Sequence, residues 1–283
     1  MKINFPVSYF LVVFLCLAAM ELGADSVSSS TWTSGGYQTS LISGNGKPGR
    51  ITLALISDGY TAGEKDKFLR DAKRIADGLF TSNGFKGMED LFNIYAAFTA
   101  AKQSTLNRSS GETQFTADII SGDPKDEKKL IAYIRKNFPA MQAVMAIANS
   151  KEDGVGVCTS DFKFAIVPSD ADFSLSIAIH EAGHLFGELV DEYAGSDEEG
   201  PNVTRNKMNP PWKGLSNKTP IEIAVDDDDP RGSGYFRPSS ENCVMLDNEE
   251  TINFCAVCKD VLRKAIAALE NGKVPLDTSP LPQ

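Results

Sequence analysis

Apolar and polar positions along the first two thirds of the chain predict strands and helices in turn. Four short, mostly apolar runs have the length of buried strands: Ile51–Ser57, Asn93–Phe98, Gln142–Ala148 and Phe162–Val167. Thr61-Ala-Gly-Glu64 is typical of a capping box and opens a segment with apolar residues at helical spacing. A second amphipathic helix is predicted at Pro124–Phe138. This alternation predicts an α/β layer with the sheet largely covered.

A third predicted helix follows this layer, and then the pattern changes. Phe173–Phe186 has the apolar density of a buried helix, and Asp172 is suited to be its N-cap. From Gly195 to Asn242 the chain is rich in Pro, Asn, Gly, Ser and acidic residues and shows little periodicity. Regular structure is predicted again at Ala256–Glu270, which has one apolar face.

These changes predict a single domain at residues 51–283 that is built from two lobes. The N-terminal lobe, residues 51–187, is expected to be ordered, and the C-terminal lobe, residues 188–272, to be irregular and to end in a helix. Residues 273–283 are expected to form a flexible tail, and the Ser/Gly-rich residues 25–50 a flexible leader.

Residues 1–24 have the pattern of a secretory signal peptide, with a lysine, an apolar run and small residues before Asp25. A membrane anchor needs roughly 20 consecutive apolar residues, and this run is shorter. We therefore expect a secreted protein without a membrane anchor. The formal net charge of −10 disfavours a nucleic-acid partner, because phosphate binding requires clustered Lys and Arg.

Four cysteines remain once the signal peptide is removed, namely Cys158, Cys243, Cys255 and Cys258. Four cysteines in a secreted chain indicate two disulfides. Three pairings are open, although a bridge between Cys255 and Cys258 would be strained. The alternative is a small zinc knot, which would need closer pairs than Cys158 and Cys243 offer. We therefore expect disulfide bonds.

The motif His180-Glu-Ala-Gly-His184 contains both histidines of the chain and predicts a metal site. On a helix the two imidazoles lie one turn apart on one face and can converge on one ion. Glu181 is rotated by about 100°, which is the position of a general base that acts on water. A buried charged glutamate would cost several kcal/mol without a partner, and a dication is such a partner.

A catalytic zinc ion takes three protein ligands, so the site needs one more. Asp191 and Glu192 are both candidates for the third ligand. Gly187 is expected to take the left-handed conformation that ends a helix and to turn the chain back toward the metal. Glu188 would lie about 6 Å beyond His184 on a continuing helix and would reach the ion poorly.

Several blocks of the chain resemble, in the same order, those of the IgA-peptidase-type (igalysin) metallopeptidases, a metzincin-like family of secreted zinc enzymes. The longest is HEAGHLFGELVDEY, residues 180–193, and the others are Asp58–Thr61, Asn93–Tyr95, Pro201–Thr204, Trp212, Cys243–Met245 and Phe254–Cys258. Together they cover most of residues 51–265. The resemblance implies a metzincin-like, two-lobed α/β (α+β) metalloprotease fold, with a mixed sheet and packed helices in the N-terminal lobe.

The resemblance also implies Zn²⁺ as the cofactor, with His180, His184 and Asp191 as ligands and Glu181 as the general base. The common metzincin ligand lies three residues after the glycine, where this chain has Val190, so Asp191 takes its place one residue later. Glu192 remains the alternative ligand.

Three further residues are assigned roles after this resemblance. Metzincins carry a methionine on a tight turn beneath the metal, the Met-turn, and Met245 fits that place. Tyr193 and Tyr235 are candidates to donate a hydrogen bond to a tetrahedral oxyanion, although packing of a loop is the alternative role for each.

These features together predict a secreted zinc endopeptidase whose polypeptide substrate pairs with an exposed edge strand such as Phe162–Val167. Two other functions are considered. One is a catalytically silent secreted binding protein that retains the metal site, and the other is a zinc hydrolase of non-peptide amides. The sequence leaves the cleavage preference and the oligomeric state open.

Overall fold

The structure is a computed structural model that describes most of the chain between residues 31 and 270. The described residues are 31–34, 36–106, 124–151, 157–159, 163–193, 195, 198–214, 220–224, 233–238 and 242–270. The predicted signal peptide, residues 1–24, and the predicted tail, residues 273–283, lie outside them.

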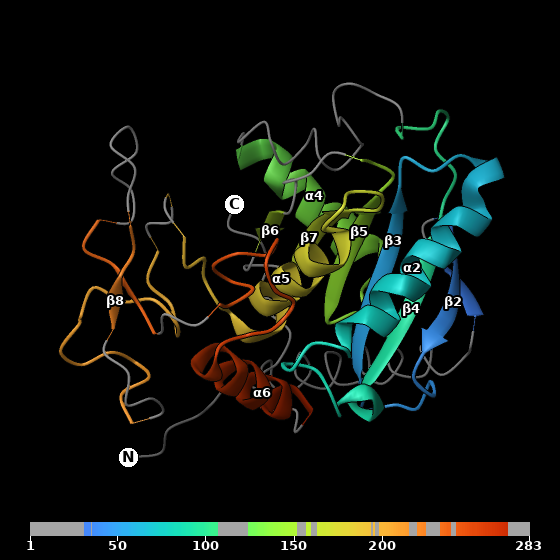
Figure 1. Ribbon diagram of the computed structural model, residues 1–283. Helices are drawn as coiled ribbons and strands as arrows, with labels where there is room; N and C mark the ends of the chain where they lie inside the picture. The colour runs from blue at the N-terminus through green and yellow to red at the C-terminus, as the bar shows by residue number, and fades with distance from the viewer. Residues whose placement is uncertain are drawn as a thin grey trace, which may run out of the picture.

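Seven strands form one mixed sheet in the order β1-β2-β4-β3-β5-β7-β6 (Figure 1). The four central strands β4, β3, β5 and β7 are parallel, whereas β1, β2 and β6 are joined by antiparallel pairing. The strands are β1 Thr31–Ser34, β2 Tyr37–Ser43, β3 Ile51–Asp58, β4 Phe92–Phe98, β5 Ala143–Ala148, β6 Val157–Thr159 and β7 Phe164–Pro168.

Helices cover both faces of this sheet, which confirms the predicted α/β class. The helical segments are η1 Ala62–Glu64, α2 Lys65–Leu79, η2 Glu89–Leu91, α4 Pro124–Asn137, α5 Ser174–Gly187 and α6 Ala256–Glu270. A small hairpin of β8 Ile221–Glu222 and β9 Phe236–Arg237 lies in the C-terminal part. Among the helices of the described residues, none combines the length and apolar character needed to cross a bilayer.

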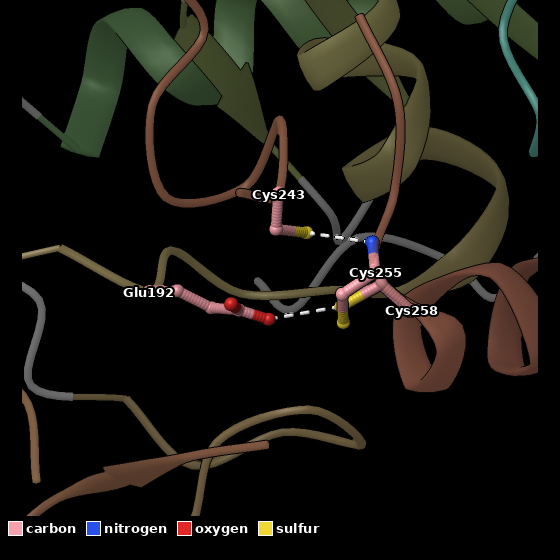
Figure 2. Close-up of side chains that lie close together, drawn as sticks. All are labelled: Glu192, Cys243, Cys255 and Cys258. Carbon is pink, nitrogen blue, oxygen red and sulfur yellow. Dashed lines mark hydrogen bonds between the residues drawn. The ribbon is translucent and has the colours of Figure 1, made fainter. Parts of the chain in front are cut away.

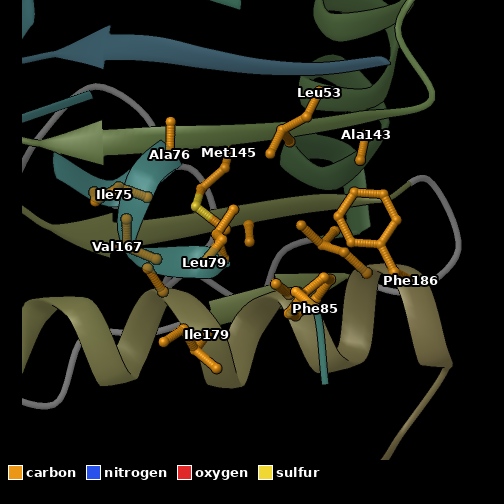
Figure 3. Close-up of a cluster of buried hydrophobic side chains, with 14 of the residues drawn as sticks. Leu53, Ile75, Ala76, Leu79, Phe85, Ala143, Met145, Val167, Ile179 and Phe186 are labelled. Carbon is orange, nitrogen blue, oxygen red and sulfur yellow. The ribbon is translucent and has the colours of Figure 1, made fainter. Parts of the chain in front are cut away.

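The central strands are apolar throughout because each buries both faces, as parallel strands between helices must. In β3, Leu53 and Leu55 face the larger core with α2, α5 and α6, whereas Ala54 and Ile56 face the smaller core with α4. Figure 3 shows the larger core, in which Leu79 of α2 and Ile179 and Phe186 of α5 converge on the sheet. The helix with both histidines is therefore anchored along its length by apolar packing.

The structure differs from the sequence-based expectation at the N-terminal edge of the sheet. Residues 25–50 are not a flexible leader throughout, since β1 and β2 fall within them and β2 pairs with β4. Tyr37 in β2 is buried, packs edge-to-face on Phe138 and shares a 2.7 Å hydroxyl–hydroxyl hydrogen bond with Tyr133. Strand β2 is held by backbone pairing with β4 and by the packing of Tyr37 on Phe138. Its polar composition gives no apolar pattern from which a strand could be predicted.

Two other expectations are corrected. The run Phe162–Val167 is not an edge strand, because β7 pairs with β5 on one side and with β6 on the other. The last strand in the order at this end is β6. Helix α5 begins at Ser174 with Phe173 as its N-cap, so Asp172 does not cap it.

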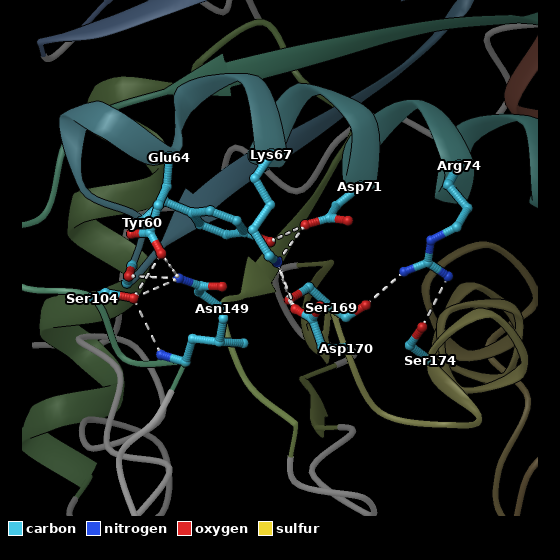
Figure 4. Close-up of polar contacts among 12 residues, drawn as sticks. Tyr60, Glu64, Lys67, Asp71, Arg74, Ser104, Asn149, Ser169, Asp170 and Ser174 are labelled. Carbon is cyan, nitrogen blue, oxygen red and sulfur yellow. Dashed lines mark hydrogen bonds and ion pairs between the residues drawn. The ribbon is translucent and has the colours of Figure 1, made fainter.

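Polar contacts tie α2 to the loops at the carboxyl ends of the parallel strands (Figure 4). The Arg74 guanidinium donates to the Ser169 carbonyl at 2.6 Å and to the Ser174 hydroxyl at 2.9 Å. Ser169 follows β7 and Ser174 opens α5. Lys67 adds an ion pair of 2.5 Å with Asp170 in the same loop. Together these bonds fix where the metal-motif helix starts.

The predicted capping box at Thr61 is confirmed and belongs to the same network. The Glu64 carboxylate accepts hydrogen bonds from the Thr61 backbone and hydroxyl, from Ser104 and from Asn149, at 2.8–3.1 Å. Partial burial by itself would raise the pKa of Glu64, but these donated hydrogen bonds lower it from 4.5 to about 2. The ionised carboxylate therefore stabilises this corner of the fold.

We predict that Glu64→Gln makes the free energy of unfolding less dependent on pH between about 4.5 and 2. The folded pKa is below the unfolded value, so the contribution is complete above pH 4.5 and is lost as pH falls toward 2. At neutral pH the variant should lose about 1–3 kcal/mol. Urea unfolding across this pH range measures both effects. Glu249→Gln, at an exposed glutamate, is the control, and equal losses in the two variants would contradict the assignment.

Candidate active site

Helix α5 brings His180 and His184 to one face, as the motif predicts. Their Nε2 atoms are 3.0 Å apart, and the ring planes are nearly perpendicular at 79°. Both rings are largely shielded from solvent, with side-chain exposures of 5% and 15%. The histidines are therefore held close together in a nearly dry environment.

A backbone carbonyl lies at hydrogen-bond distance from the Nδ1 atom of each histidine. His180 Nδ1 is 2.7 Å from the Val244 carbonyl oxygen, and His184 Nδ1 is 2.5 Å from that of Leu189. A carbonyl can only accept, so each Nδ1 carries a proton, and in the neutral form of each ring Nε2 then presents its lone pair inward. Sequence reasoning missed both carbonyls, because a backbone acceptor leaves no signal in residue type.

Asp191 completes a triangle with the two histidines. Its Oδ1 atom is 3.0 Å from His180 Nε2 and 3.3 Å from His184 Nε2. This oxygen is buried and has no hydrogen-bond donor. Three acceptor atoms facing one another at these distances repel unless a cation lies among them.

The three atoms fit a metal ion by distance and by donor type. Neighbouring ligands of a tetrahedral zinc ion are about 3.3–3.6 Å apart when the bonds are 2.0–2.2 Å long, slightly longer than the edges of this triangle. Two imidazoles and one carboxylate leave a position for water, as catalytic zinc sites do. His180, His184 and Asp191 would therefore hold the ion. They are the only group of possible metal ligands among the described residues that contains histidine.

The electrostatics of the triangle favour a positive charge at its centre. Burial alone would lower the pKa of His184, but Asp191 and Glu181 raise it to about 9. Burial alone would raise the pKa of Asp191, but the two histidines lower the pKa of that carboxyl well below its usual range. The site therefore attracts either a proton or a metal ion.

Glu181 is buried beside the histidines, and its Oε2 atom has no hydrogen-bond partner. Burial raises the pKa of this carboxyl, and the neighbouring His180 and His184 oppose the shift. A buried carboxylate oxygen without a partner is costly, so its retention here is consistent with a role in proton transfer.

Glu192 does not reach the triangle, in which Asp191 and not Glu192 lies beside the two histidines. Its Oε1 atom accepts hydrogen bonds from Asn202 and from the Cys258 thiol, both at 2.9 Å. Burial raises the pKa of Glu192 to about 7. Asp191 and Glu192 are adjacent in the chain, yet their side chains contact different groups.

Asn202 positions the segment that carries Asp191. The sequence pointed to it only as a member of the Pro201–Thr204 block and gave it no role. Its side chain accepts from the Val190 backbone N–H at 2.9 Å and donates to the Val190 carbonyl at 2.8 Å. It also donates to Glu192. Asn202 thereby holds the residues on both sides of Asp191.

Met245 lies on a tight turn packed against α5. The turn is closed by hydrogen bonds from Leu246 N and Asp247 N to the Cys243 carbonyl, at 2.8 and 2.9 Å. A Cβ atom at Gly183 would lie 2.8 Å from Met245 Sδ, closer than side chains normally approach. The glycine of the HEAGH motif therefore permits this turn to support the histidine helix.

The chain leaves α5 differently from expectation. The left-handed residue is Glu188, with φ of 51°, whereas Gly187 remains within the helix. Gly187 is small for packing, since a Cβ atom there would lie 3.2 Å from Leu262 Cδ1 of α6. Glu188 still turns the chain back as predicted, and Leu189 then places its carbonyl at His184.

The two tyrosines lie in different environments. Tyr193 is 43% exposed and stacks near His180, with ring centroids 6.3 Å apart, and burial together with Asp191 raises the pKa of its hydroxyl. Tyr235 is buried against Val203 and Ile223, with the Arg205 guanidinium 4.4 Å from its ring centroid. These are packing contacts, and a role in an oxyanion hole stays a prediction for both tyrosines.

The cysteines do not form the expected bridges among the described side chains. Cys243, Cys255 and Cys258 are free and buried, and the Cys158 side chain lies outside the described residues. Their sulfur atoms gather with Glu192 in a second group of ligand-type atoms.

One of two comparisons with known proteins identifies a family. A family model described as IgA peptidase M64 matches residues 41–221, which is well over half of the 283 residues. The comparison with curated proteins returned no match. The matched region includes β3, the HEAGH helix α5 and Asp191, so the predicted family is confirmed. The chain belongs to the IgA peptidase M64 family and is therefore a metallopeptidase by family.

Proposed function

We propose that the protein is a secreted, zinc-dependent endopeptidase. The observation that carries the proposal is the triangle of His180, His184 and Asp191, in which three buried acceptor atoms meet beside the unpartnered carboxylate of Glu181. Secretion rests on the signal-peptide pattern of residues 1–24. Sequencing the N-terminus of the protein recovered outside the cell tests it.

His180, His184 and Asp191 would hold the zinc ion, whose chemistry when bound is to polarise the substrate carbonyl and to acidify water. The Val244 and Leu189 carbonyls keep each imidazole in the tautomer that presents Nε2. Asn202 and the turn around Met245 hold the Asp191 segment, since Glu192 N also donates to the Met245 carbonyl at 2.9 Å.

Glu181 acts as the general base and then as the acid. Its free Oε2 accepts a proton from the attacking water, and the same carboxyl delivers that proton to the amine of the leaving peptide. Burial on α5 excludes bulk water from this carboxyl and keeps the proton at the reacting bond.

The substrate is an extended polypeptide that pairs with β6. This strand is the last in its sheet order, runs antiparallel to β7 and contacts α5. Among the described residues no strand pairs with its other edge, and a substrate strand can add there by backbone hydrogen bonding, which is tolerant of side-chain identity.

We predict that Glu181→Gln lowers the rate of peptide-bond cleavage by about 10²–10⁴-fold while zinc remains bound. The amide keeps the shape of the carboxylate but cannot take up the proton. Cleavage of an unfolded protein, followed by mass spectrometry at matched zinc content, measures the effect. Glu188→Gln is the control, because Glu188 lies on the same segment, is exposed and pairs with Lys163. Equal rates for Glu181→Gln and the unmutated chain would exclude the mechanism.

We also predict that Asp191→Asn raises the free zinc concentration needed for half-maximal activity. The shift should exceed the roughly 10–100-fold change caused by losing a residue that supports a ligand, because the amide replaces a direct ligand. Activity in zinc buffers measures it. Glu188→Gln, at an exposed glutamate outside the triangle, is the control and should leave the zinc dependence unchanged. Equal zinc dependence of Asp191→Asn and the unmutated chain would exclude Asp191 as a ligand.

A further inference from the structure

A second group of ligand-type side chains lies next to the candidate active site, and the proposed reaction does not use it. A carboxylate oxygen of Glu192 and the sulfur atoms of Cys243, Cys255 and Cys258 all lie within 4.8 Å of one another, and all four residues are buried. Figure 2 shows the four side chains converging. We call these four residues the thiol cluster.

Three separate segments of the chain contribute to the thiol cluster. Glu192 belongs to the irregular segment after α5, Cys243 to the tight turn that carries Met245, and Cys255 and Cys258 to the start of α6. The spacing of Cys255 and Cys258, with two residues between them, places both sulfur atoms at the first turn of the helix. This spacing is typical of a zinc-binding pair.

The donor atoms fit a closed tetrahedral zinc site. Zinc–sulfur bonds of about 2.3 Å place neighbouring sulfur ligands about 3.8 Å apart, which agrees with the observed limit of 4.8 Å. Three thiolates and a carboxylate fill all four positions and leave none for water, which is the pattern of structural rather than catalytic zinc. Soft thiolate ligands also favour zinc over magnesium or calcium.

Glu192 gives an independent indication that the thiol cluster binds a cation. The residue is 1% exposed, and its Oε1 atom accepts from Asn202 and from Cys258. Its Oε2 atom is buried with no hydrogen-bond partner. A buried carboxylate oxygen facing thiols requires a partner, and a dication bound by the same thiols supplies one.

The surroundings support negatively charged sulfur ligands. The Cys255 backbone N–H donates to Cys243 Sγ at 3.3 Å, and the cluster lies at the N-terminus of α6, where the helix dipole favours negative charge. Arg237 adds a positive charge that acts on Glu192.

A disulfide satisfies this arrangement less well than a metal ion. Three thiols meet here, so any one bridge leaves the third thiol buried against Glu192. A bridge also leaves the Glu192 Oε2 atom without a partner. Only a four-coordinate ion uses all the converging atoms.

We propose that Glu192, Cys243, Cys255 and Cys258 bind a structural Zn²⁺ ion that is distinct from the ion at His180, His184 and Asp191. Binding exchanges the thiol protons for the metal and releases them to solvent, without any change of oxidation state. This site does not depend on the peptidase activity.

The structural ion would couple directly to the active site. Glu192 follows Asp191, and Cys243 precedes Val244, whose carbonyl orients His180. Joining the two segments to α6 therefore fixes both a ligand of the active site and the acceptor that orients another. The proposed role explains how a lobe with little regular structure holds these groups in place.

We test the proposal by loading the full, reduced chain with Co²⁺ and recording its absorption spectrum. The expected result is a thiolate-to-cobalt charge-transfer band in the near ultraviolet. It should persist in a His180→Ala, His184→Ala variant and disappear in a Cys255→Ser, Cys258→Ser variant. Zinc content should be two ions per chain in the unmutated protein and one in each double variant. Cys158→Ser, at the remaining cysteine of the predicted mature chain, is the matched control and should retain both ions.

The outcomes separate this proposal from the proposed function. A thiolate band in the histidine variant supports the thiol cluster even if no peptidase activity is found. Absence of the band in the unmutated, cobalt-loaded chain overturns the proposal, as does a disulfide among the three cysteines that forms in excess zinc. Both the cobalt spectrum and the disulfide test are made on the unmutated chain. The proposal can therefore be overturned even if a cysteine variant fails to fold.

Discussion

The approach of His180, His184 and Asp191 to within about 3 Å of one another is the constraint on which the site depends. Atoms that all present lone pairs do not gather in a buried place without a cation. Their approach requires each imidazole proton to be on Nδ1, and the carbonyls of Val244 and Leu189 accept those protons. The rest of the lobe is arranged to keep these acceptors in position.

The sheet and the irregular lobe contribute differently to this arrangement. Helix α5 is rigid because apolar side chains anchor it to a sheet that is buried on both faces, and Arg74 ties its first residue to α2. Between α5 and α6 the described residues contain only the short β8–β9 hairpin as regular structure. The segments of the irregular lobe are held by single side chains such as Asn202 and by the turn at Met245, which fits against Gly183.

Sequence patterns predicted the repetitive part of this fold well. The central strands follow from continuous apolar runs, because they bury both faces. The amphipathic helix at Pro124 and the last helix Ala256–Glu270 follow from periodic apolar positions, because each buries one regular face. The predictions were wrong where a single contact or residue, rather than a repeated pattern, determines the local structure. Strand β2 is held by backbone pairing and Tyr37, and Glu188 rather than Gly187 takes the left-handed conformation.

The sequence by itself determined the family, the α/β layer and the pairing of His180 with His184, because residues four apart on a helix must share a face. Only the tertiary structure placed Asp191 rather than Glu192 beside the two histidines, and only it placed the three cysteines as free thiols around Glu192. The physical reason is that both outcomes depend on how non-periodic segments, distant in sequence, meet in space. Local residue preferences carry no information about contacts between such distant segments, whereas the packed structure specifies them.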